Sequence, residues 1–60
     1  MTRKQAIKAA AAAMRKQHRE QFVVYECGDY DHCNQYELDT FYQGARVTDV
    51  IESDMDEWHL

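Results

Sequence analysis

The first third of the chain alternates apolar and cationic positions with the period of an α-helix. The run from Gln5 to Arg19 is dense in Ala, Lys, Arg, Gln and Met, which are good helix formers. Thr2 and Gln5 have the spacing of a capping box in which Thr2 is the N-cap. We therefore predict a helix over residues 3–19, with an apolar side thin enough to lie close on a sheet. The apolar side comprises Ala6, Ile7, Ala10, Ala13 and Met14. The cations take the opposite side: Lys4, Lys8, Arg15, Lys16 and Arg19.

From residue 21 the pattern changes to that of β-strands. Residues 22–27 are rich in β-branched and aromatic side chains, and both faces of this segment are largely apolar. We predict a strand over residues 21–27 that is central in a sheet or buried in a dimer. Turn-forming residues at 28–32 follow. The alternation of residues 34–39 then predicts a half-buried second strand, paired with the first as a hairpin.

The rest of the chain predicts one short turn and one further strand. Residues 39–44 resemble a single capped turn closed by Gly44, which can adopt positive φ. Residues 45–51 are β-branched again and predict a third strand, while the acidic residues 52–60 form either a frayed tail or a short anchored segment. We therefore expect a single α+β domain over residues 1–60, with one N-terminal amphipathic helix packed on a three-stranded, mainly antiparallel β-sheet.

Charge is divided between the two parts of the chain. Residues 1–19 carry six of the seven Lys and Arg and no acid, a formal +6, whereas residues 20–60 carry all 11 acids and Arg46, a formal −10, and the sum is −4. Charge pattern tunes partners and solubility more than fold, so this division is the best clue to function. A chain of 60 residues leaves little room for an enclosed substrate cavity, and no catalytic signature is present. We expect no enzymatic activity and no cofactor.

Two cysteines flank the predicted turn, and the sequence leaves their state open. Cys27 and Cys33 lie near His32, but a zinc site wants four ligands at tighter pair spacing, so we expect no metal. A disulfide across the hairpin is geometrically plausible, while a reducing cytoplasm favours two free, semi-buried thiols.

The basic start of the chain bears on location. Its apolar run is broken by Lys8 and is mostly Ala, unlike a secretory or membrane-spanning segment. Removal of residues 1–19 as a transit peptide would leave about 40 residues, which is a marginal size for a domain. We therefore expect a cytoplasmic protein without membrane contact.

The acids after residue 19 predict a negative surface on the sheet. Glu37 and Asp39 are two apart in the predicted second strand, which places their side chains about 6.5–7 Å apart on one face. Carboxylates spaced along a rigid sheet resemble the phosphates of a nucleic-acid strand and would be drawn to a Lys- and Arg-lined groove. The bland alternative is that acids only keep a small protein soluble. The other acids of the predicted surface are Glu26, Asp29, Asp31, Asp49, Glu52, Asp54, Asp56 and Glu57. The aromatic side chains expected to anchor a partner are Tyr25, Tyr30, Tyr36, Tyr42 and Trp58.

In general character the chain resembles small phage-encoded anti-defence proteins, notably anti-CRISPR proteins. The shared characters are brevity, a lone α+β domain beginning with Met1, strong acidity after Glu20 and no catalytic signature; they cover the whole chain without a diagnostic motif. The resemblance implies an inhibitor that binds a CRISPR effector, a larger host protein or ribonucleoprotein, and blocks its nucleic-acid groove, sometimes by mimicking DNA. The protein itself would then bind no nucleic acid directly. The basic helix departs from an all-acidic mimic.

Two other interpretations stay open. The cations of the helix are able to neutralise several phosphates, which would make the chain a small nucleic-acid-binding or regulatory module acting through its basic face. Alternatively, the basic helix of one copy docks on the acidic sheet of another, so the protein is a monomer or a homodimer.

Overall fold

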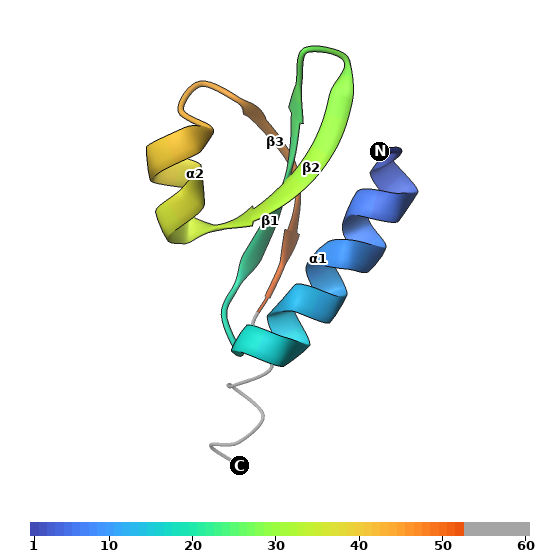
Figure 1. Ribbon diagram of the computed structural model, residues 1–60, viewed down its shortest axis with the longest axis vertical. Coiled ribbons are helices and arrows are strands. Elements are labelled where there is room, and N and C mark those ends of the chain that lie inside the picture. Colours follow the sequence, from blue (N-terminus) through green and yellow to red (C-terminus); the bar gives the residue numbers. More distant parts are fainter. Residues whose placement is uncertain (53–60) are drawn as a thin grey trace.

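The N-terminal helix agrees closely with the sequence pattern. The computed structural model describes residues 1–52, and α1 spans Arg3–Gln17 (Figure 1). Thr2 Oγ1 accepts a hydrogen bond from Gln5 N–H at 3.2 Å, and Gln5 Oε1 accepts one from Thr2 N–H at 2.9 Å. The predicted capping box is therefore confirmed. The helix ends before the predicted residue 19 because His18 adopts a left-handed backbone with φ 55°.

Three strands form one antiparallel sheet with β1 in the middle. β1 spans Gln21–Glu26, β2 spans Asp29–Asn34 and β3 spans Arg46–Ile51, in the order β2-β1-β3. The chain crosses from the β2 edge to the β3 edge through a second helix, α2, which spans Gln35–Phe41 (Figure 1). Gly44, between α2 and β3, has the predicted positive φ, 82°. The α+β class, the antiparallel sheet and the central position of the first strand are confirmed.

The predicted second strand is wrong, because residues 34–39 belong to α2 and its N-cap. The predicted turn, residues 28–32, instead contributes most of β2. Asn34 Oδ1 accepts a hydrogen bond from Glu37 N–H at 2.8 Å, and Glu37 Oε1 accepts one from Asn34 N–H at 3.1 Å. A short alternating run does not separate a strand from the first turns of a helix. This reciprocal capping box stabilises the start of a helix at these residues.

The β1–β2 hairpin turns at two residues only. Cys27 and Gly28 have φ 55° and 80°, the pair of positive values that a type I′ turn requires. Cys27 is exposed in this turn, while Cys33 is buried in β2 opposite Phe22, and both thiols are free. Cys27 lies in the turn, and four strand steps of about 3.3 Å from Asp29 place Cys33 about 13 Å further along β2. A disulfide needs less than about 7 Å, so the disulfide across the hairpin is excluded within one chain.

The two helices cover opposite faces of the sheet (Figure 1). Ala6 and Ala10 of α1 are fully buried against Val23 of β1, so the thin alanine side lies on the sheet as predicted. On the other side, Tyr42 at the end of α2 bonds to Asp31 of β2. Below, the α1 face and the α2 face denote the two sides of the sheet. Within residues 1–52 neither helix combines the length and the apolar character that crossing a membrane requires.

Candidate functional site

Three carboxylates gather at the end of the β1–β2 hairpin. Asp29 and Asp31 are two residues apart in β2, so their side chains leave the same side of the sheet about 6.5–7 Å apart. Glu26 of β1 is the cross-strand partner of Asp29 and shares that side. Since Asp31 bonds to Tyr42 at the end of α2, this side is the α2 face.

Glu37 lies in the first turn of α2, toward the other end of β2, where its side chain bonds to Asn34 N–H. Burial, followed by the charges of Glu37 and Asp31, raises the pKa of the Cys33 thiol to about 11. The two carboxylates therefore flank one buried cysteine. We name the set of Glu26, Asp29, Asp31 and Glu37 the acidic face.

Local hydrogen bonds hold the two β2 carboxylates in place. Asp31 Oδ2 accepts a hydrogen bond from the Tyr42 hydroxyl at 2.5 Å, and Asp31 Oδ1 accepts one from the next backbone N–H at 2.8 Å. The hydroxyl bond is the main cause that raises the pKa of Tyr42 to about 12. Asp29 forms an ion pair with the N-terminal amine of Met1 and accepts a hydrogen bond from Tyr30 N–H at 2.9 Å. Both contacts hold the pKa of Asp29 below its ordinary value.

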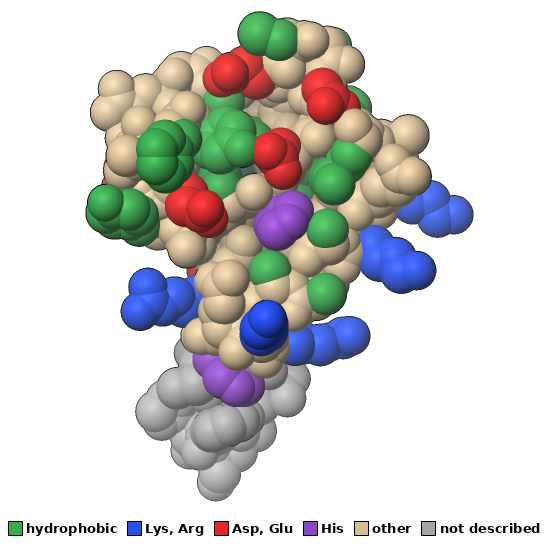
Figure 2. Space-filling view, viewed as in Figure 1, with side chains coloured by type: hydrophobic (Ala, Val, Ile, Leu, Met, Phe, Trp, Pro, Cys, Tyr) green, Lys and Arg blue, Asp and Glu red, His purple; other side chains and the backbone are tan. Residues whose placement is uncertain are grey.

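The division of charge along the sequence is kept in space. Figure 2 shows Asp and Glu side chains over the hairpin and α2, where hydrophobic side chains lie between them. Lys and Arg side chains project around α1 and the lower part of the molecule in the same view. The protein therefore presents a negative region and a positive region at different places on its surface.

The predicted pairing of Glu37 with Asp39 does not form. Both residues lie in α2, where side chains two positions apart do not face each other. Asp39 instead accepts a hydrogen bond from Gln35 Nε2 at 3.0 Å. The carboxylates that do stand at strand spacing are Asp29 and Asp31, which the sequence pattern placed in a turn.

Other acids of the predicted surface lie elsewhere. Asp49 of β3 is bound by Arg3 of α1, and Glu52 is exposed just beyond the end of β3. Three acids and one anchor lie outside the described residues: Asp54, Asp56, Glu57 and Trp58.

The aromatic side chains divide between the two faces. Tyr36 of α2 is 69% exposed, and so is Phe41, which the sequence interpretation omitted. The helical period of α2 places Phe41 between the half-buried Glu37 and Leu38, so periodicity would not have identified it as exposed. Tyr42 is half-buried, and its hydroxyl donates a hydrogen bond to Asp31. Tyr30 packs beside the α1 core, with its ring centroid 4.9 Å from that of Tyr25.

The cations of the alternative basic face are exposed on α1 and just beyond it. Arg15 and Lys16 occupy the last turn of α1, where positive charge complements the helix dipole. The full set is Lys4, Lys8, Arg15, Lys16 and Arg19. These side chains form a positive surface separate from the acidic face.

The acidic face is suited to binding cationic groups, because three of its four carboxylates lie on one side of a hairpin whose positions are fixed by backbone pairing, and the fourth lies on α2 over that side. Among residues 1–52, no group of three or more His, Cys, Asp or Glu side chains is arranged to hold a metal ion. No family model, curated protein or solved structure matches the chain. The geometry of the surface is therefore the ground for assigning its function.

Proposed function

We propose that this protein is a non-enzymatic inhibitor that binds a larger nucleic-acid-binding protein through the acidic face and blocks the binding of DNA there. The observation that carries the proposal is the placement of Glu26, Asp29 and Asp31 on one side of a single hairpin. Carboxylates at strand spacing present negative charge at regular intervals. A groove lined by Lys and Arg attracts such a surface for the reason that it attracts phosphates.

The facing of Glu26 and Asp29 does not serve the stability of the hairpin. Glu26 and Asp29 stand directly opposite each other, and like charges at such cross-strand positions are destabilising. Among residues 1–52, only Asp29 of this set is paired with a cation, the N-terminal amine. Glu26, Asp31 and Glu37 are left without a cationic partner among residues 1–52, and this unneutralised charge supports a role in binding.

Exposed aromatic side chains border the acidic face. Tyr36 and Phe41 lie on α2, the element that also carries Glu37. Aromatic side chains are frequent anchors of protein interfaces because they bury a large area with few rotatable bonds. Within the proposal, the carboxylates steer association and the two rings contact an apolar rim of the groove.

The partner proposed is a CRISPR effector-type complex in the cytoplasm of a bacterial host, bound by this protein as a monomer or homodimer without a cofactor. The general characters shared with anti-CRISPR proteins support that choice of partner. The acidic face by itself supports a wider class of partners, namely proteins with a basic nucleic-acid groove.

The test neutralises two acids while keeping side chains of nearly the same shape. The immobilised protein is expected to retain a nucleic-acid-binding protein from nuclease-treated host lysate, and added DNA is expected to displace it. The double variant Glu26→Gln, Asp31→Asn should lower this retention at least tenfold, about 1.4 kcal/mol. The matched control, Glu20→Gln with Glu52→Gln, removes two exposed acids outside the acidic face and should retain the partner fully.

Two results would overturn the proposal. One is full retention of the partner by a folded Glu26→Gln, Asp31→Asn variant. The other is a partner that is captured only while nucleic acid is intact, because bridging by nucleic acid would then explain the capture.

A second candidate function is a small nucleic-acid-binding or regulatory module that acts through α1. The exposure of all five cations of the basic face favours it. It predicts direct, steeply salt-dependent binding of DNA or RNA that is lost in Lys8→Gln with Arg15→Gln and is kept when the acidic face is neutralised. A gel-shift series over salt concentration separates the two candidates.

A further inference from the structure

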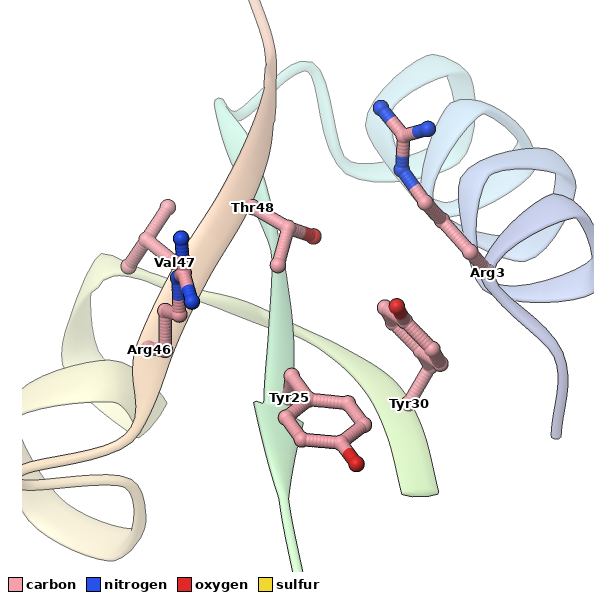
Figure 3. Close-up of a pocket in the computed structure, with 6 residues that line it drawn as sticks. All are labelled: Arg3, Tyr25, Tyr30, Arg46, Val47 and Thr48. Carbon is pink, nitrogen blue, oxygen red and sulfur yellow. The ribbon is translucent and has the colours of Figure 1, made fainter. Parts of the chain in front are cut away.

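A cleft on the α1 face lies apart from the acidic face. It has a volume of about 440 Å³ and opens between the first turn of α1, the end of the hairpin and the start of β3. Figure 3 shows two tyrosines between Arg3 on one side and β3 on the other. Six residues line the cleft: Arg3, Tyr25, Tyr30, Arg46, Val47 and Thr48. Both charged residues of this lining are cations.

The two tyrosines form an aromatic surface in the cleft. Tyr25 and Tyr30 are cross-strand partners at the end of the hairpin, with ring centroids 4.9 Å apart and planes inclined at 59°. Tyr30 N–H donates a hydrogen bond to the Met1 carbonyl oxygen at 3.3 Å, so the chain start lies level with this pair. The first buried residue of α1 is Ala6, so the start of the helix does not bury the tyrosine pair. Tyr25 is 40% exposed. Its ring is therefore available for stacking.

Arg46 places an uncompensated positive charge beside this aromatic surface. It is the only Lys or Arg after residue 19, so it is the one exception to the division of charge along the chain. It stands opposite Tyr25 in the β1–β3 register. Among residues 1–52 it has no ion-pair partner and no hydrogen bond from its side chain.

Arg3 supplies a second guanidinium that is already fixed in position. Its Nε and Nη2 atoms bind the two oxygens of Asp49 at 2.9 and 2.7 Å. A guanidinium has five N–H donors, so Arg3 keeps donors for a second acceptor. The cleft thus combines one unpaired and one anchored guanidinium with two aromatic rings.

We infer that this cleft binds a nucleotide, with the base stacked on Tyr25 and the phosphate bound by Arg46 and Arg3. Aromatic rings next to cationic side chains are the combination that proteins use to bind nucleotides of single strands. The nucleotide is either a free mononucleotide or part of a single strand. A base in a duplex is already stacked and cannot reach the ring of Tyr25. An acidic peptide has carboxylates for the arginines but no base for the tyrosines.

The inference does not rest on the proposed function, since the cleft and the acidic face lie on opposite sides of the sheet. Binding of a partner protein at the acidic face and binding of a nucleotide in the cleft therefore fail or succeed separately.

The experiment is a ¹⁵N–¹H NMR titration of the full chain with unlabelled ligands. Thymidine monophosphate tests the free nucleotide, and an eight-residue oligothymidylate tests the single strand. Ribose 5-phosphate, hexaglutamate and a DNA duplex serve as comparison ligands that lack a base, a phosphate or an unstacked base. We expect saturable shifts at Tyr25, Tyr30 and Arg46 with one or both of the first two ligands, and at least tenfold weaker binding of the comparison ligands at this cleft.

Variants assign the binding to the cleft. Tyr25→Ala should weaken nucleotide binding about tenfold, whereas Tyr25→Phe should retain it because the stacking ring is kept. Arg46→Gln should weaken binding and lower the salt dependence by about one phosphate contact. Lys8→Gln removes an exposed cation from α1, and Tyr36→Ala removes an exposed ring from α2; both should bind as the wild type does. The spectra of the variants report whether each one is folded.

Any of three outcomes would overturn the inference. The first is the absence of saturable binding by both nucleotide ligands. The second is binding of ribose 5-phosphate or hexaglutamate in the cleft as strong as that of the nucleotides. The third is binding that Lys8→Gln weakens as much as Arg46→Gln does, which would assign it to the general positive charge of the molecule. If Tyr25→Ala does not fold, the inference is still tested by comparing the nucleotide affinities of Arg46→Gln and Lys8→Gln.

Discussion

Arg3 and Asp49 join the first turn of α1 to β3 across 46 positions of the sequence. Arg3 Nε donates to Asp49 Oδ2 at 2.9 Å and Nη2 donates to Oδ1 at 2.7 Å, which makes the pair bidentate. The hydrogen bonds from Arg3 are the main cause that holds the pKa of Asp49 below its ordinary value of 3.8. The same contact raises the pKa of Arg3. The ion pair also holds Arg3 in place at one side of the cleft that Tyr25 and Tyr30 line.

This pair predicts a loss of stability in acid. Because the pKa of Asp49 is lower in the folded than in the unfolded chain, its contribution is present above pH 3.8 and is lost as the pH falls through the lowered folded value. Asp29 acts in the same direction, since its pKa is lowered by the N-terminal amine. Urea midpoints measured from pH 7 down to pH 2 should fall below pH 4. The fall should be smaller in Asp49→Asn, and identical profiles for the variant and the wild type would contradict this account.

The close contact of α1 with the sheet predicts a sharp difference between two alanines. Ala10 is fully buried at the sheet, so Ala10→Leu has no room and should lower the free energy of unfolding by about 1–3 kcal/mol. Ala12 is exposed on the same helix, and Ala12→Leu should change stability by less than about 0.5 kcal/mol. Urea unfolding followed by circular dichroism measures both. Equal effects would mean that α1 does not pack through its alanine side.

The capping box of α2 predicts the cost of its removal. Asn34→Ala deletes the acceptor for Glu37 N–H and should destabilise the protein by about 1 kcal/mol. Thr40→Ala, an exposed change inside the same helix, should be neutral or slightly stabilising. If residues 34–39 formed a strand, the change at Asn34 would remove no cap, so a neutral Asn34→Ala would contradict the helix.

The two cysteines should differ strongly in reactivity. Cys27 is exposed in the hairpin turn, whereas Cys33 is buried and its thiol has a pKa of about 11. A thiolate is the reactive form, so at pH 8 a thiol reagent such as DTNB should modify one thiol quickly and the second only after urea unfolds the chain. Cys27→Ser should abolish the fast phase, and Cys33→Ser should leave it unchanged. Fast modification of both thiols in the native protein would argue against the burial of Cys33.

Features that depend on residues close together in the sequence could be predicted from the sequence. The capping box at Thr2, the positive φ of Gly44 and the alanine side of α1 follow from local hydrogen bonding and helical period. The central place of β1 follows from its apolar side chains on both faces. The helix α2 was also predictable in principle, because Asn34 and Glu37 have capping-box spacing. The short alternation of residues 34–39 masked this signal.

The sequence by itself determined the α+β composition, the first helix with its buried side, and the division between basic and acidic parts, because these features rest on local propensity and on the order of charges along the chain. Only the tertiary structure decided which acids lie together and where Arg46, the only Lys or Arg after residue 19, lies. The β1–β2 register sets Glu26 against Asp29, and the β1–β3 register sets Arg46 against Tyr25. Register depends on the packing of side chains far apart in sequence, and a shift of one residue would turn each of these side chains to the other face.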